Sequence, residues 1–451
     1  MTAIMQDMDA AIATSHLAAA EQAEATTRWQ DAVREYEACL SAAGPAPAGA
    51  GIDEAAVLTA LGRCYWNLSE ARPAWRMLRR AIAIYQERGD GPGQARATLE
   101  ILRIWGPPDR QRAMTEEALQ ALGDGDPYLR ARLFLDLSWN EDGDEHYTDA
   151  LALAERHGFE DILTMRTQRR AWELFEQGEV DESVRLFEQA HETYARLNVY
   201  HPASGVLRGA AFNLIEAGRL DEGYAFAQRA FEYAAGVNLH FQSQLALMDL
   251  VGVAYARDEF DRCDELLAQA PTNSDFRGDL YRMWMAEARG DLDGALQLMV
   301  DPQRGGNTPT AVGQIHASAA GILYRAGKPD AAAQALRAWV AVERRDSEPL
   351  WTEAPAMREC LLALGDDDLV GRVHDAFADR ERRSKTPAIF STLQGRALAP
   401  LRGGIAARLG LADEAERAYR EGLAWCEASG CVRDAELCRA GLAELSAQAA
   451  R

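Results

Sequence analysis

A repeated pattern of small and large residues constrains the fold of this chain more than any other sequence feature. In each copy, a small residue is followed by a large residue at +3, a small one at +12 and an apolar one at +16. The residue at +19 is small in most copies. Small residues at these spacings let two antiparallel helices approach closely, and the large ones fill the space between them. The repeat therefore predicts helical hairpins. The four clearest copies begin at Gly62, Ala171, Ala211 and Ala320.

Looser copies extend the pattern over nearly the whole chain. Between the two helices a glycine, such as Gly178 or Gly218, is placed to end the first helix in a left-handed conformation. Ala, Leu, Arg and Glu, which favour helices, dominate the sequence between these breaks. We expect about eleven hairpins with an irregular period. The small positions expected on the second helices are Ala32, Ala74, Ala113, Ala150, Ser183, Gly223, Cys263, Ala295, Ala332, Val370 and Ala415.

The pattern resembles the tetratricopeptide repeat. The segments 178–183 and 290–295 carry the Gly-x-x-Asp-x-Ala hinge of that repeat, with Ser183 in place of alanine in the first. The irregular period and the segment 116–132 also look like the C-terminal repeat arms of bacterial signalling ATPases and LuxR-type regulators. This chain lacks their ATPase motif and shows no basic recognition helix. The resemblance therefore implies a fold, and the activities of those regulators are not carried over.

We predict an all-α fold, an α-solenoid wound as a right-handed superhelix, that forms one stack over residues 1–451. Three loop segments, 44–51, 301–309 and 380–387, interrupt the rhythm and could act as hinges. The pattern resumes after each of them, so we interpret them as long loops between helices rather than domain boundaries. The last helix is expected to cap the stack or to form a dimer face.

The charge and the cysteines limit where the protein acts and what it binds. The formal net charge is −22, which disfavours nucleic acid and anionic membrane surfaces. No apolar run is long enough to cross a bilayer, and the first twenty residues lack the basic start of a signal peptide. The seven cysteines fit no disulfide framework and no common zinc spacing. We therefore expect a cytoplasmic protein without a metal or another cofactor.

Sequence motifs for catalysis are absent. There is no Walker A motif, no H-E-x-x-H, no G-x-S-x-G and no dinucleotide fingerprint. His201 and His240 each precede a first helix and lie one repeat apart, so an acid–base site assembled across repeats stays open as an alternative. The prediction is nonetheless that the chain is not an enzyme.

Repeat geometry selects candidate binding residues on the first helices. If the small residue of each first helix faces its partner helix, the residues three before and one, four and five after it face the other way, toward the concave side. An aromatic stripe flanked by Arg and Gln results, and aromatic and Arg side chains are common anchors of interfaces. For each single aromatic side chain, packing in the core is favoured over contact with a ligand, whereas the stripe as a whole favours a binding role. The candidates are Arg63, Trp66, Trp139, Gln168, Trp172, Phe175, Arg208, Phe212, Tyr255, Trp284 and Tyr324.

These features favour an interaction protein that holds a peptide or protein segment in a concave groove. The acidic surface would select a basic or amphipathic partner. One alternative is a signalling regulator whose solenoid changes shape when it binds a peptide or small ligand. The other is the enzyme with a site assembled across repeats. The oligomeric state and the partner's identity are not evident from the sequence.

Overall fold

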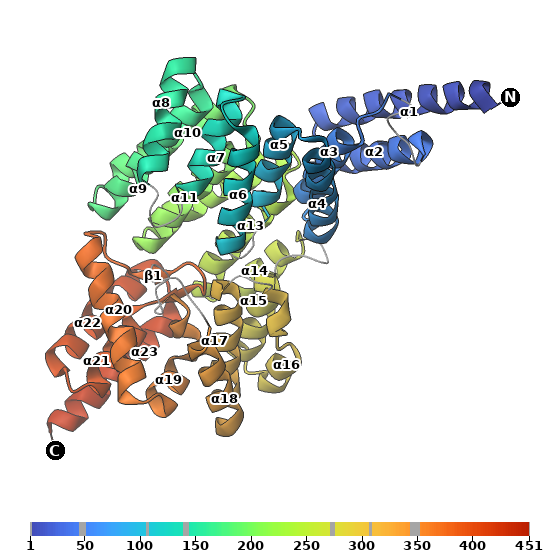
Figure 1. Ribbon diagram of the computed structural model, residues 1–451. Coiled ribbons are helices and arrows are strands. Elements are labelled where there is room, and N and C mark those ends of the chain that lie inside the picture. The colour runs from blue at the N-terminus through green and yellow to red at the C-terminus, as the bar shows by residue number, and fades with distance from the viewer. Residues whose placement is uncertain are drawn as a thin grey trace. The chain divides into compact units, whose positions relative to one another are not determined.

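The protein is an all-α solenoid built from helical hairpins (Figure 1). A computed structural model describes residues 2–44, 51–104, 108–138, 144–270, 276–305, 309–342 and 352–450. Within these residues, 23 α-helices follow one another along the chain. Consecutive helices pack as pairs, as in α1/α2, α3/α4, α7/α8, α17/α18 and α21/α22, and the last helix, α23, packs on α21 and α22. The predicted fold class and the predicted hairpins are confirmed.

The first helices of the hairpins, with the unpaired last helix, are α1 (Thr2–Ala25), α3 (Glu54–Asn67), α5 (Gly91–Leu102), α7 (Pro127–Leu137), α9 (Glu160–Glu176), α11 (Tyr200–Glu216), α13 (His240–Ala256), α15 (Phe276–Ala288), α17 (Pro309–Arg325), α19 (Arg358–Leu364), α21 (Ala399–Arg408) and α23 (Val432–Ala449). The second helices are α2 (Trp29–Ala43), α4 (Ala71–Arg88), α6 (Pro108–Leu122), α8 (Asp144–His157), α10 (Val180–Arg196), α12 (Leu220–Gly236), α14 (Phe260–Leu267), α16 (Leu292–Gln297), α18 (Pro329–Val340), α20 (Asp367–Arg383) and α22 (Ala412–Ser429). Two short 3₁₀ helices, η2 (Pro302–Gly305) and η4 (Ala354–Met357), and two strands, β1 (Phe390–Ser391) and β2 (Arg396–Ala397), complete the described elements.

Burial of the small residues supports the proposed hairpin packing. Ten of the eleven positions predicted on second helices are buried, and nearly all of these have no exposed surface. Ala113 is the exception, because its side chain on α6 is exposed and Thr115 and Ala118 are buried on that helix instead. Gly178 and Gly218 have φ of 87° and 80°, the left-handed conformation predicted for the end of a first helix.

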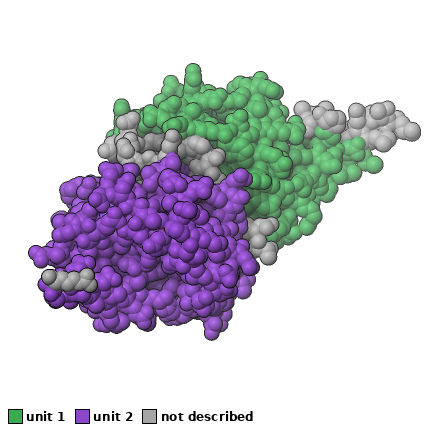
Figure 2. All heavy atoms as spheres, turned by 90° about the horizontal axis from the view of Figure 1, so that it is seen from below, with its two compact units in different colours: residues 1–166, 193–201, 233–243 green, residues 167–192, 202–232, 244–451 purple. Residues whose placement is uncertain are grey.

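The chain divides into two compact units, which are coloured separately in Figure 2. Unit 1 comprises residues 1–166, 193–201 and 233–243, and unit 2 comprises residues 167–192, 202–232 and 244–451. The boundaries fall within α9 to α13 and at none of the three expected hinge segments. Residues 45–50 and 306–308 of the first two segments lie outside the described residues. Whether the chain hinges at these segments stays a prediction.

Residues 384–398 of unit 2 break the hairpin pattern in a way that the sequence analysis did not predict. The expected loop 380–387 begins inside α20, which continues to Arg383. Strands β1 and β2 then pair antiparallel, with Phe390 opposite Ala397 and Ser391 opposite Arg396. This small β-hairpin is tied to its surroundings, because the main-chain N–H of Ala397 donates to Asp434 at 2.7 Å.

The backbones of α17 and η4 approach closely in unit 2, and this contact predicts how a substitution there changes the stability. A Cβ at Gly321 on α17 would lie only 2.0 Å from the carbonyl oxygen of Ala356 in η4, whereas a Cβ at Gly371 on α20 would meet nothing within 4 Å. We expect Gly321→Ala to lower the free energy of unfolding by about 1–3 kcal/mol, because backbone must move to relieve the clash. Gly371→Ala is the matched control and should be neutral or stabilising by up to about 1 kcal/mol. Urea denaturation of both variants tests this, and equal effects would contradict the packing described.

Candidate functional site

Two half-buried aromatic residues lie together on successive first helices of unit 2. Trp172 on α9 and Phe212 on α11 are separated by one repeat, and their ring centroids are 6.3 Å apart in a T-shaped arrangement. Trp172 also packs edge-on against the buried ring of Phe187, at 5.2 Å. Ala171 and Ala211 are fully buried, so each helix turns its small residue inward and leaves the next residue partly accessible. Trp172 and Phe212, two residues of the expected aromatic stripe, therefore lie next to each other.

Polar candidates flank this pair one helical turn earlier. Gln168 lies four residues before Trp172, and Arg208 lies four residues before Phe212; both are half-buried. The Nε of Arg208 is 2.8 Å from a carboxylate oxygen of Asp249 on α13, whose side chain is almost fully buried. We call Gln168, Trp172, Arg208 and Phe212 the first-helix patch. It offers two aromatic surfaces, an amide and a guanidinium group that is already paired.

Burial contradicts the predicted surface position of Phe175, Tyr255 and Trp284 in unit 2. Their side chains are at most 3% exposed, so they are packed core rather than a binding surface. Tyr255 shows the cause, because the guanidinium of Arg433 on α23 lies 4.3 Å from its ring and donates to its hydroxyl oxygen. Residues far along the chain thus cover the face that an open stack would expose.

Trp284 and Tyr324 differ in their surroundings. The ring of Trp284 packs perpendicular to that of Tyr281, with centroids 5.1 Å apart. Tyr324 on α17 is only partly buried and packs against the hydrophobic cluster that includes Trp339 and Phe377. Trp139, another candidate, lies outside the described residues.

In unit 1, the candidate Trp66 is core and Arg63 belongs to an ion-pair network. Trp66 is 4% exposed, and its ring lies 4.6 Å from that of Phe241, so its predicted surface position is wrong. Arg63 pairs with Glu24 at 2.5 Å and with Glu100 at 3.3 Å. Because these carboxylates already satisfy it, Arg63 is less available to a ligand than the sequence suggested.

The two histidines of the enzyme alternative, His201 and His240, lie in the first turns of α11 and α13. The Nδ1 of His201 lies 3.0 Å from the Nε2 of Gln242, and burial together with the Arg103 guanidinium lowers the pKa of His201 well below its usual value. Burial also lowers the pKa of His240. Within the described ranges, no group of three or more His, Cys, Asp or Glu side chains could hold a metal ion. His201 and His240 are therefore neutral side chains at neutral pH.

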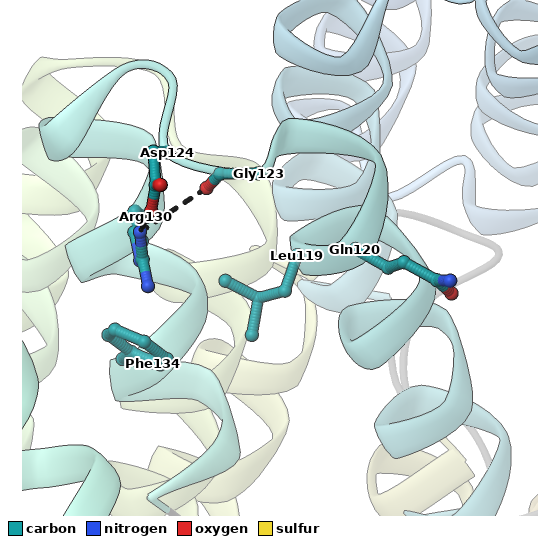
Figure 3. Close-up of a pocket in the computed structure, with 6 residues that line it drawn as sticks. All are labelled: Leu119, Gln120, Gly123, Asp124, Arg130 and Phe134. Atoms are coloured by element: carbon teal, nitrogen blue, oxygen red, sulfur yellow. Dashed lines mark hydrogen bonds and ion pairs between the residues drawn. The ribbon is translucent and has the colours of Figure 1, made fainter.

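A hollow of about 240 Å³ lies between the end of α6 and the start of α7 in unit 1 (Figure 3). Leu119 and Phe134 supply its apolar side, and Arg130 points toward Asp124, with which it pairs at 2.5 Å. Ligand pockets usually enclose about 300–1,000 Å³ and hold several converging polar groups. This hollow is smaller, and its main charged group is already neutralised. Gly123 and Gln120 complete its lining.

Comparisons with known proteins find only distant similarity. No protein-family model and no curated protein matches the sequence. Among solved structures, a Rap protein complexed with competence and sporulation factor is 13% identical, covering 87% of this chain and 99% of that one, with a TM-score of 0.40. Yeast Tom70 is 11% identical over 96% of both chains, with a TM-score of 0.31. A human IFIT1 dimer with m7Gppp-AAAA is 12% identical over 98% of this chain and 95% of that one, with a TM-score of 0.34. Similarity this distant indicates nothing about the ligand of this chain.

The network around Arg63 predicts how unit 1 responds to acid. Burial would raise the pKa of Glu100, but Arg103 and Arg63 outweigh it and lower that pKa to about 2, from 4.5. A carboxyl group with a lowered pKa in the folded state adds stability above pH 4.5, and that stability is lost as the pH falls toward 2. We expect Glu100→Gln to reduce stability at pH 7 and to flatten its loss between pH 4.5 and 2.

Thermal melting across that pH range, compared with wild type, measures the effect. The control is Glu155→Gln, which removes an exposed partner of Arg166 in the same unit. Exposed ion pairs contribute little, so this variant should follow wild type. An unchanged acid profile in Glu100→Gln would show that the network does not stabilise unit 1.

Proposed function

We propose that this protein is a non-catalytic interaction protein that binds a peptide or protein segment on the first-helix patch of unit 2. The observation that carries this proposal is the paired, half-buried Trp172 and Phe212 on adjacent first helices. Partly exposed aromatic rings on a rigid helical scaffold lose little conformational entropy on binding and bury a large apolar area. Two such rings one repeat apart would anchor a segment that crosses the two helices.

The polar side chains of the patch suit a peptide. Gln168 offers an amide that can both donate and accept, as a peptide main chain requires. Arg208 is held in place by Asp249, so its remaining N–H groups are available in a fixed direction. A segment with apolar anchors and a polar main chain matches this combination better than a purely apolar ligand does.

Charge favours a basic or amphipathic partner over nucleic acid. The net charge is −22, and many arginines of unit 2 are already paired with carboxylates, as in the pairs of Arg219 with Asp181 and of Arg257 with Asp221. Binding to phosphates needs several unneutralised cations that act together. We therefore propose a protein partner with a net positive or mixed segment.

The cysteines support a reducing compartment, and we propose the cytoplasm. All seven are free and buried, so the fold does not depend on disulfides. Within the described part of the chain, no helix has both the length and the apolarity that a membrane crossing requires.

Substitution of the two aromatics tests the function. We expect the double variant Trp172→Ala, Phe212→Ala to capture at least tenfold less of a partner that wild type retains from native lysate, because two interface anchors of more than about 1 kcal/mol each are lost. The retained protein is identified by mass spectrometry, and its affinity for both forms is then measured with purified components.

The matched control is Tyr128→Ala, which removes an exposed aromatic from unit 1. It should bind the partner as wild type does. Thermal melting must show that all three proteins are folded. Equal affinity of wild type and the double variant would place the interface outside the patch and refute the proposed site.

A further inference from the structure

A segment of the chain itself, which bends at Lys385 and Thr386, lies across the ends of two first helices in unit 2. We call residues 384–389 the arm. The main-chain N–H of Lys385 donates to the carbonyl of Glu176 on α9 at 2.6 Å, and the N–H of Ile389 donates to the carbonyl of Glu216 on α11 at 3.1 Å. The hydroxyl of Thr386 donates to the carbonyl of Phe175. The arm therefore satisfies the last-turn carbonyls of Glu176 and Glu216, whereas the carbonyl of Phe175 also accepts from the N–H of Gly178 at 3.0 Å.

The arm contacts the last residues of α9 and α11 in the same way. Glu176 and Glu216 end successive first helices and are one 40-residue repeat apart, while the arm residues that contact them are four apart. Four fully extended residues span at most about 13 Å. The bend at Lys385 and Thr386 shortens the arm toward the roughly 8–10 Å that separates the axes of neighbouring helices. Two of the three bonds use only the arm's main chain, so another extended segment could make them equally well.

The buried side of the arm is small. Ser384, Thr386 and Ala388 are buried, whereas Lys385 and Pro387 are exposed. Ile389, at the end of the arm, is the one large apolar side chain and is half-buried. Burial of the three small side chains removes little apolar surface from water, so the arm is held mainly by its hydrogen bonds. The arm should therefore detach at a lower cost than segments with large buried side chains.

The β-hairpin that follows the arm is held much more firmly. Phe390 and Leu398 are almost fully buried there. The amide of Gln394 bridges η4, because it accepts from the N–H of Ala356 at 2.6 Å and donates to the carbonyl of Glu353. The N–H of Leu398 also donates to the carbonyl of Ile389 at 2.9 Å, so the hairpin holds the last residue of the arm. Residues 384–388 can thus leave while the hairpin stays in place.

The arm lies within one helical turn of the first-helix patch. Phe175 comes three residues after Trp172, and Glu216 comes four residues after Phe212. Arg380, just before the arm, lies 5.9 Å from the ring of Phe175 and 3.6 Å from the carboxylate of Glu216. Next to the arm, the C-termini of α9 and α11 thus carry partial negative charge, and the carboxylate of Glu216 is buried there.

We propose that the arm is an exchangeable internal ligand, and that an extended basic segment of a partner displaces it from the last turns of α9 and α11. This inference rests on the proposed function and specifies the partner: a segment with small side chains at alternate positions and a basic side chain near the helix ends. The buried Phe175 then becomes part of the site only after the arm has left.

A synthetic peptide of residues 380–391 with a fluorescent label is the probe, because it carries the arm's own chemistry. The variant Ala388→Glu places a carboxylate at a buried position of the arm and should expel it. Pro387→Glu, with the same charge change at the exposed neighbouring position, is the matched control. Fluorescence anisotropy should show at least tenfold tighter peptide binding to Ala388→Glu than to wild type or the control, because the internal competitor is removed. Equal binding to all three folded proteins would overturn the proposal.

Hydrogen exchange provides a test that does not depend on the folding of Ala388→Glu. In wild type, the amides of Lys385 and Ile389 should exchange faster than the amide of Ala356, and Thr386→Val should speed their exchange two- to tenfold by removing one hydrogen bond. Exchange of all three amides at one common rate, unaffected by Thr386→Val, would show that the arm opens only when unit 2 unfolds and would overturn the proposal.

The two proposals can fail separately. If the peptide does not bind Ala388→Glu but the Trp172, Phe212 double variant loses the captured partner, the arm is not exchangeable and the first-helix patch stands. If the peptide binds Ala388→Glu and the double variant keeps its partner, the arm site stands and the patch is wrong.

Discussion

The close approach of paired helices at small residues is the constraint on which the rest of the structure depends. Ala74, Ser183 and Ala332, which lie on second helices, have no exposed surface. A larger residue there would separate the helices and lose the packing around it. Because this contact fixes the rotation of each first helix, it also determines which residues face the other way. The positions of Trp172 and Phe212 follow from those of Ala171 and Ala211.

The pairing of helices also determines where the helix ends lie. Every first helix ends with carbonyl groups that lack intrahelical partners, and a stack of hairpins brings these ends into a row. In unit 2 the chain itself uses two of them, through the N–H groups of Lys385 and Ile389. Trp425 donates from its indole N–H to the carbonyl of Gly218 in the same region. The carbonyl groups at the ends of the first helices accept hydrogen bonds from this segment, which explains why the segment lies there. An extended segment of a partner could donate to the same carbonyl groups.

The local parts of this architecture could be predicted from the sequence, because helix pairing depends on residues within one repeat. The hairpins, the left-handed glycines and the small positions were all evident, apart from Ala113. The burial of Phe175, Tyr255 and Trp66 was not, because it depends on Arg380, Arg433 and Phe241, which lie far away along the chain.

The arm was missed for a related reason. Its sequence shows only that the repeat pattern is interrupted at Pro387 and Gly395, and an interruption does not reveal what an extended segment will contact. The one usable signal was the alternation of small and larger residues from Ser384 to Ile389, which suits a strand with one buried side.

Hydroxyl-radical footprinting of the 451-residue chain tests the central claim most directly, namely that the first-helix face of unit 2 is partly open and partly covered by its own chain. The account predicts that Trp172 and Phe212 are oxidised readily, whereas Phe175, Tyr255 and Trp284 are protected. Oxidation of Phe175 and Tyr255 at the rate of Trp172 would contradict it, because the face would then be open along its whole length.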